Sequence, residues 1–130
     1  MILEIFIMTS LLLQVDSVES QPLYNYELHG VWNRSREEEE DSVLIFRPEE
    51  YELPRVRGRE KIEFLEGGRM IFYSIAPADG FIRNNGEFTI DAAKNILTII
   101  YDSDRDNPVT FKILKLSDSI LKLKRLQMSN

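Results

Sequence analysis

The chain lacks cysteine, and it has a single histidine in 130 residues. Without cysteine it has no disulfide, no zinc–thiolate site and no thiol nucleophile. With His29 alone, a nucleophile–base pair would need a serine with a lysine, or two paired carboxylates. The carboxylates fall mostly at turns or on the outward positions of strands, and we expect His29 on the surface. The sequence therefore predicts neither an enzyme nor a bound cofactor.

Basic residues are outnumbered, with 16 lysines and arginines against 22 aspartates and glutamates, so the formal net charge is −6. The sequence contains no basic cluster that would neutralise the phosphates of a nucleic acid. An anionic membrane surface would need the same kind of cluster. We therefore expect neither of these as a partner.

The spacing of a calcium-binding loop occurs once. Asp102, Asp104 and Asp106 stand at alternate positions between the apolar runs at residues 95–101 and 109–116. Hard cations need several oxygen ligands from such a loop. Here Asn107 stands where an EF-hand loop has glycine, and Ile113 stands where it has a bidentate glutamate. The stretch therefore predicts a hairpin turn and no metal site.

Long hydrophobic runs are absent apart from the first residues, MILEIFIMTSLLLQV. This run is shorter than the about 20 apolar residues that a membrane-spanning helix needs. We interpret residues 1–20 as a secretory signal cleaved after Ser20, which would make residues 21–130 a secreted or periplasmic domain without a membrane span. The run has no basic start and contains Glu4. The alternative is an N-terminal apolar segment packed on a cytoplasmic domain.

The rest of the chain alternates apolar and polar residues in short runs separated by turn residues, with no long helical pattern. The runs are one around Trp32 and residues 42–46, 60–66, 69–75, 86–91, 95–101, 109–116 and 119–126. Such short strands at regular spacing are typical of an antiparallel meander that closes as a sandwich or a barrel. We expect a single all-β domain.

Gly30-Val31-Trp32 resembles the G-x-W element of the lipocalins and their calycin relatives, and the similarity to small bacterial lipocalin-like domains covers residues 23–126. The resemblance implies an eight-stranded antiparallel up-and-down barrel in which the first strand lies beside the last. It also implies that an arginine or lysine of the last strand covers the tryptophan. Arg125 is the candidate, because it shares a strand face with Leu121 and Leu123, and a guanidinium stacks well on an indole. Gly30, Trp32 and Arg125 thus form the expected structural signature.

A barrel of eight strands is either filled by side chains or holds one small molecule. Our first hypothesis is a carrier of a small apolar ligand. The acidic run at residues 36–41 is expected as a solvated loop at the barrel mouth, and no inward base besides Arg125 is evident, so the ligand should be neutral or cationic. The expected ligand-binding residues of the interior are Phe64, Phe72, Tyr73, Phe88, Leu97, Ile99, Tyr101, Phe111, Leu121 and Leu123.

The alternative hypothesis is a protein-interaction module, as in some small calycin barrels, such as bacterial metalloprotease inhibitors, which are similar in size and act by contacting a protein. In that case the barrel is filled, and the contact surfaces are the acidic run and residues 47–58, RPEEYELPRVRG. A cavity lined by apolar residues favours the carrier. A filled barrel with an exposed apolar patch favours the interaction module.

Overall fold

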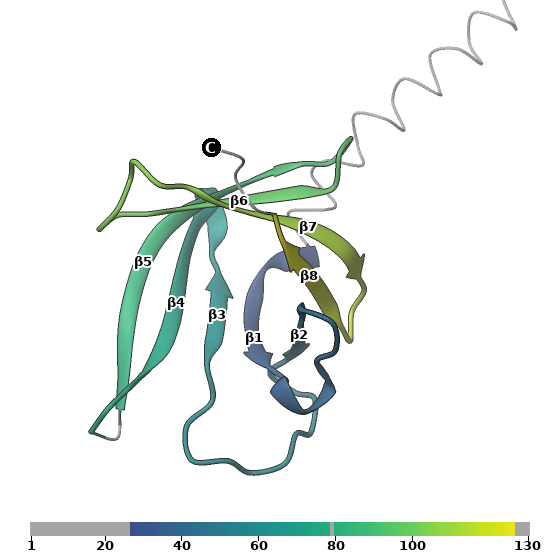
Figure 1. Ribbon diagram of the computed structural model, residues 1–130, viewed down its shortest axis with the longest axis vertical. Coiled ribbons are helices and arrows are strands. Elements are labelled where there is room, and N and C mark those ends of the chain that lie inside the picture. Colours follow the sequence, from purple (N-terminus) through teal and green to yellow (C-terminus); the bar gives the residue numbers. More distant parts are fainter. Residues whose placement is uncertain (1–26, 79, 127–130) are drawn as a thin grey trace, which may run out of the picture.

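Eight strands form a closed antiparallel barrel in the computed structural model of the chain, which describes residues 27–78 and 80–126 (Figure 1). The elements are β1 (Gly30–Arg34), η1 (Arg36–Glu38), β2 (Val43–Pro48), β3 (Lys61–Phe64), η2 (Glu66–Gly68), β4 (Arg69–Ala76), β5 (Gly80–Asp91), β6 (Ile96–Tyr101), β7 (Val109–Leu116) and β8 (Leu121–Arg125), where η marks a 3₁₀ helix. The predicted all-β, eight-stranded barrel of a single domain is confirmed. Within these ranges, no helix has the length and apolar character needed to cross a membrane. The predictions for residues 1–20 lie outside the described residues.

The strand order is up-and-down from β3 to β8, since each of these strands pairs with the next one in the sequence. The first two strands depart from the expected closure. β1 lies between β2 and β3, with Trp32 opposite both Pro48 and Ile62, and β8 pairs with β2, with Leu121 opposite Phe46. The prediction that the first strand lies beside the last was wrong. The connection over residues 49–60 is long enough to carry the chain past β1, so β2 takes the place beside β8.

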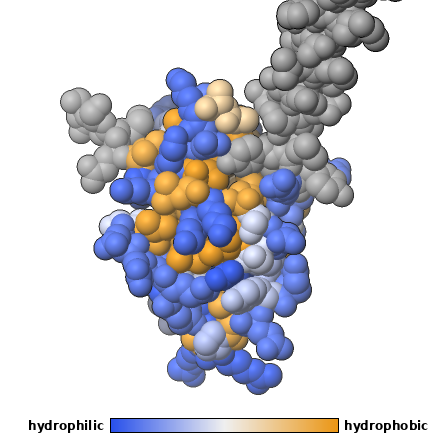
Figure 2. Space-filling view, turned by 90° about the vertical axis from the view of Figure 1, so that its right-hand side faces the viewer, coloured by the Kyte–Doolittle hydropathy of each residue, from blue (hydrophilic) through white to orange (hydrophobic). Residues whose placement is uncertain are grey.

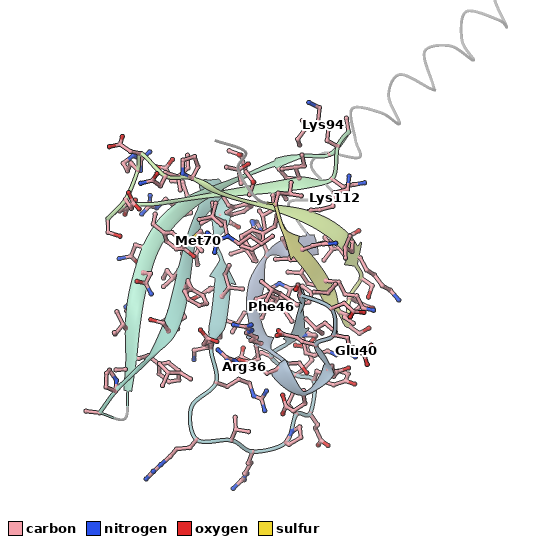
Figure 3. All side chains as sticks on the ribbon, in the orientation of Figure 1. Arg36, Glu40, Phe46, Met70, Lys94 and Lys112 are labelled. Carbon is pink, nitrogen blue, oxygen red and sulfur yellow. The ribbon has the colours of Figure 1, made fainter. Side chains whose placement is uncertain are left out.

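The interior is packed with the apolar side chains that alternate inward along the strands. Phe46 and Met70 point into the barrel in Figure 3 and are almost fully buried. The rings of Phe64 and Phe88 meet edge to face, with centroids 4.9 Å apart, which adds to the burial of their area. These side chains belong to one continuous core.

Trp32 is buried as expected, but Arg125 does not cover it. The indole is 3% exposed, and its Nε1–H donates to the carbonyl oxygen of Leu28 at 2.8 Å. Arg125 is exposed and lies opposite Phe111 on β7. Among the cation–π contacts of the described residues, none joins Arg125 to Trp32. The predicted stacking was wrong because β2 separates β1 from β8.

Gly30 serves the backbone rather than the packing. Its φ is +116°, and a Cβ built on it would meet no atom within 4 Å. A residue with a side chain rarely adopts such a φ. The glycine of the G-x-W element therefore allows the chain to turn from residues 27–29 into β1.

β5 begins at Gly80, earlier than the predicted strand at residues 86–91. Its first half pairs with β4 from Ala76 opposite Gly80 onward, whereas β6 reaches only as far as Gly86. The sequence pattern did not predict this half because Arg83, Asn84 and Asn85 do not alternate with apolar residues. The result is a long β4–β5 hairpin that projects at the lower end of Figure 1.

Candidate functional site

The ten residues predicted to bind a ligand are mostly core residues. Phe64, Phe88, Leu97, Ile99, Leu121 and Leu123 are buried in the core, and Phe72, Tyr101 and Phe111 are partly buried against it. The prediction that Tyr73 faces the barrel interior was wrong. Its hydroxyl bonds to Glu63 at 3.1 Å and its ring meets Phe81, both on the outer face. The nine inward side chains pack against one another.

Arginines pair with the glutamates of the acidic run, which stays partly exposed to solvent. Residues 36–38 form the 3₁₀ turn η1, and three residues per turn direct successive side chains to different sides. Glu37 meets Arg59 in a two-point contact of 2.8 and 2.9 Å. Glu38 meets Arg47 at 2.9 Å. The predicted loop is therefore partly exposed, with the Glu37 side chain 37% and the Glu38 side chain 35% exposed, but its pairing with arginines was not predicted.

Arg34 and Glu60 link the run to the end of the barrel. Arg34 Nε lies 2.9 Å from Glu39 Oε2, and its Nη1 lies 2.9 Å from Glu60 Oε1. Arg36 contacts the same Glu60 oxygen. Glu39 also accepts from the backbone N–H of Ile45 at 3.1 Å, so the network fastens η1 to β2. A base unnoticed in the sequence, Arg34, thus stands at this end of the barrel.

These pairs change the electrostatics of the barrel end. The bond from Arg59 lowers the pKa of Glu37 to about 2. The bond from Arg47 lowers the pKa of Glu38, and the bond to Glu39 raises the pKa of Arg34. At neutral pH the carboxylates of Glu37 and Glu38 are therefore ionised and paired with guanidinium groups. These two groups add less negative potential to the end of the barrel than unpaired carboxylates would.

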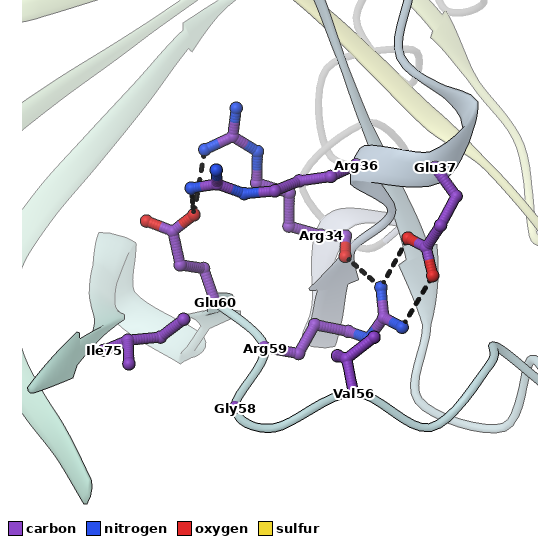
Figure 4. A pocket seen from close by; sticks show the side chains of 8 residues that line it. All are labelled: Arg34, Arg36, Glu37, Val56, Gly58, Arg59, Glu60 and Ile75. Atoms are coloured by element: carbon purple, nitrogen blue, oxygen red, sulfur yellow. Dashed lines mark hydrogen bonds and ion pairs between the residues drawn. The ribbon is translucent and has the colours of Figure 1, made fainter. Parts of the chain in front are cut away.

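Arg59 also shapes the loop over residues 49–60. Besides holding Glu37, it donates to the carbonyl oxygens of Arg34 at 2.9 Å and Pro54 at 2.6 Å. One side chain thus ties this loop to both η1 and the end of β1 (Figure 4). The loop lies across the lower end of the barrel (Figure 1).

Two adjoining pockets lie between this loop and the β4–β5 hairpin, and they share Gly58 and Ile75. Their volumes are about 340 and 300 Å³. We call their combined lining the barrel-end surface. It consists of Arg34, Arg36, Glu37, Val56, Arg57, Gly58, Arg59, Glu60, Ile75, Gly80 and Phe81.

Apolar side chains stand out on the barrel-end surface. Val56 is 52%, Ile75 44% and Phe81 47% exposed. Figure 4 shows Val56 and Ile75 on opposite sides of the larger pocket, with Gly58 between them. Arg36, whose side chain is 65% exposed, lies at its edge. The surface thus combines apolar contact area with a guanidinium that solvent reaches.

A second apolar area lies on the wall that η1, β7 and β8 form. Figure 2 shows this side of the molecule, with apolar residues near the centre and hydrophilic residues around them. Leu114 is exposed here, beside a pocket of about 410 Å³ that Lys115, Lys122, Glu40 and Asp41 also line. This wall offers one strongly exposed large apolar side chain, whereas the barrel-end surface offers three.

The aspartate-rich turn carries ion pairs. Asp102 meets Arg69 at 2.9 Å and Arg105 at 3.4 Å, and Asp104 accepts from Asn107. Within the described ranges, no group of three or more histidine, aspartate and glutamate side chains is arranged to hold a metal ion. His29 is exposed, as expected.

Sequence reasoning proposed residues 47–58 as a contact surface under the alternative hypothesis but missed the ion pairs that position them. A signal was present, because Arg36 begins the acidic run and Arg34, Arg47 and Arg59 flank it on both sides. Comparison with known proteins adds no further identification: no family model matches the chain, and no curated protein and no solved structure is significantly similar to it. What is established is an eight-stranded antiparallel barrel, a fold consistent with the calycins.

Proposed function

We propose that this chain is a protein-binding module without catalytic activity, and that it binds its partner through the barrel-end surface. The observation that carries the proposal is the exposure of Val56, Ile75 and Phe81 together around Gly58. Exposed apolar groups gathered in one place, with polar groups around them, are typical of interaction sites. Arginine and aromatic side chains are enriched at the energetically important positions of such sites.

The packing of the interior favours this role over that of a carrier. The apolar side chains that a carrier would offer to a ligand contact one another in the core instead. None of the nine inward residues lines any of the three surface pockets described above. A ligand inside the barrel would have to displace close-packed side chains, which costs free energy. The carrier hypothesis and its ligand charge stay predictions.

Preorganisation also supports a binding role. Arg59 makes two bonds to Glu37 and two to backbone carbonyls, so the loop carrying Val56 has a defined position. A surface that is ordered before binding loses less conformational entropy when the partner arrives. The four bonds of Arg59 therefore make the barrel-end surface a better binding site than a mobile loop of the same composition.

We propose also that the barrel is a remote member of the lipocalin-like calycins. A closed antiparallel barrel with a buried tryptophan two residues after a glycine supports this relationship. The position of β1 between β2 and β3 departs from it. Export of the domain, if residues 1–20 act as a signal, remains part of this proposal.

Site-specific photocrosslinking in the native host tests the proposed function. A benzophenone amino acid is placed at Val56, at Ile75, or at Leu114, which is a matched control because it is exposed and apolar on another wall. We expect one protein adduct of the same mass from positions 56 and 75, and none from position 114. An adduct from position 114 alone, or no adduct from any position, would overturn the proposal.

A further inference from the structure

The first half of β5 has a free edge. β6 pairs with β5 only from Gly86 to Asp91, so within the described part of the chain residues 80–85 have β4 on one side and no paired strand on the other. The last contact on that side is the Asp102 N–H, which donates to the Asn85 carbonyl at 2.9 Å. In Figure 1 β4 is the neighbour on one side of the lower half of β5, and no described segment runs along its other side.

The alternation of an antiparallel strand shows which backbone groups face this edge. The N–H and C=O of one residue point to the same side, and the side changes with every residue. Since the Asn85 carbonyl faces Asp102 on the β6 side, the groups of Arg83 and Phe81 face that side too. Two donors and two acceptors are therefore directed outward from the edge.

The edge carries few of the features that prevent strand pairing. Proteins usually protect an exposed edge with proline, lysine, a bulge or a covering segment. Residues 80–85 contain no proline, and their one charge is Arg83. Phe81 and Ile82 are 47% and 49% exposed on opposite faces of the hairpin. The pairing with β4 is continuous, without a register shift.

We propose that the free edge of β5 at residues 80–85 binds an extended segment of the partner, with acidic and apolar side chains, as an added β-strand. Strand addition draws affinity from main-chain hydrogen bonds and specificity from alternate side chains. The inference rests on the proposed function, because the edge adjoins the barrel-end surface at Gly80 and Phe81.

Charge identifies the chemistry of the partner. Arg83 shares the outer face with Lys61, whose Nζ lies 5.2 Å from the centre of the Phe81 ring. Both Arg83 and Lys61 lie against the ring of Tyr73. An acidic side chain on the added strand would meet these cations, and an apolar one would cover Phe81. Opposite charges across neighbouring strands stabilise pairing.

A second copy of the chain fits this edge less well. Two copies paired antiparallel through this short segment would bring the two Arg83 side chains near each other, and like charges on adjacent strands destabilise pairing. Each copy also carries a net charge of −6, which opposes their approach. An acidic segment of another protein avoids the first conflict.

Amide hydrogen exchange of the ¹⁵N-labelled protein with a synthetic probe tests the inference. The probe is a blocked peptide of alternating glutamate and valine. Its controls are the same peptide with lysine for glutamate, and the same peptide with alternate backbone nitrogens methylated. We expect the glutamate peptide to slow exchange at the amides of Phe81 and Arg83, and the lysine and methylated peptides to bind more weakly.

Two variants separate the contribution of the Arg83 backbone N–H to peptide binding from that of its charged side chain. Arg83→Ala removes the charge and keeps the N–H, whereas Arg83→Pro removes both, at an edge-facing position where proline is tolerated. We expect Arg83→Pro to bind the glutamate peptide about fivefold more weakly than Arg83→Ala, the effect of about one hydrogen bond. The methylated peptide gives the same information with the unaltered protein if Arg83→Pro does not fold.

The failures are distinguishable. If the glutamate peptide perturbs Val56 and Ile75 without protecting Phe81 and Arg83, strand addition is overturned while the protein-binding role stands. If the lysine peptide binds equally well, or if no peptide binds, the inference is overturned, and crosslinking still decides the proposed function. If the amides of Phe81 and Arg83 are protected by dimerisation in the absence of peptide, the proposed acidic partner is overturned in favour of a second copy of the chain.

Discussion

Replacing Trp32 with alanine should destabilise the barrel by about 3–5 kcal/mol. A large aromatic side chain removes about 150–250 Å² of surface from water, which corresponds to about 4–6 kcal/mol at 25 cal/mol per Å². That value is an upper estimate because the unfolded chain already covers part of the side chain. Alanine substitutions of buried aromatics cost about 3–5 kcal/mol. Trp32, at 3% exposed, should lie in this range.

Trp32→Phe separates the hydrogen bond from the packing. Phenylalanine keeps most of the apolar contact but leaves the buried carbonyl of Leu28, which now accepts from the indole at 2.8 Å, without that donor. An unsatisfied buried acceptor costs about 1–3 kcal/mol. We therefore expect Trp32→Phe to fall between the wild type and Trp32→Ala.

The assay is urea denaturation followed by far-UV circular dichroism, because removing the sole tryptophan removes the fluorescence signal. Arg125→Ala is the control. Since Arg125 is exposed and does not stack on the indole, its replacement should change the free energy of unfolding by less than about 0.5 kcal/mol. A cost for Arg125→Ala as large as that for Trp32→Phe would refute the conclusion that the indole is held by its hydrogen bond to Leu28 and not by Arg125. So would a cost below about 1 kcal/mol for Trp32→Ala.

Further predictions concern the strand contacts and the loop. Gly86→Ala should destabilise the barrel by about 1–3 kcal/mol in urea melts, because its Cβ would lie 2.5 Å from the Ile100 carbonyl oxygen; wild-type stability would contradict this contact. Arg59→Lys should speed proteolytic cleavage within residues 49–60, because lysine cannot make the two-point bond to Glu37; unchanged cleavage would contradict the role of Arg59. The pKa of Glu37 is lowered to about 2 in the folded state, so its bond to Arg59 should be complete above about pH 4.5 and lost as the pH falls toward 2. Carboxyl chemical shifts measured by NMR should follow this course, and a midpoint near the ordinary value would exclude the pair.

Local alternation predicted most strands because one face of each is buried. Residues 109–116 form β7 over the predicted range, and Ile62 and Phe64 of β3 are buried as their spacing indicates. Such a pattern depends only on neighbours in the sequence. The fold class followed from the number and spacing of these runs.

The closure of the barrel depends on contacts distant in sequence, and it was not predictable from alternation. Whether β8 pairs with β1 or β2 depends on how the loop over residues 49–60 crosses the barrel end. Because β8 pairs with β2, Arg125 does not lie next to Trp32 on β1. The ion pairs of the acidic run were missed for a similar reason, since Arg47 and Arg59 reach it only once η1 and this loop are folded.

The most direct test of the central claim is native mass spectrometry of the protein purified from its own host. We predict that the wild type carries a protein partner, that Phe81→Asp loses it, and that Leu114→Asp retains it, because only Phe81 belongs to the barrel-end surface. A small molecule bound one to one in all three proteins, with no protein partner, would contradict the account and restore the carrier hypothesis.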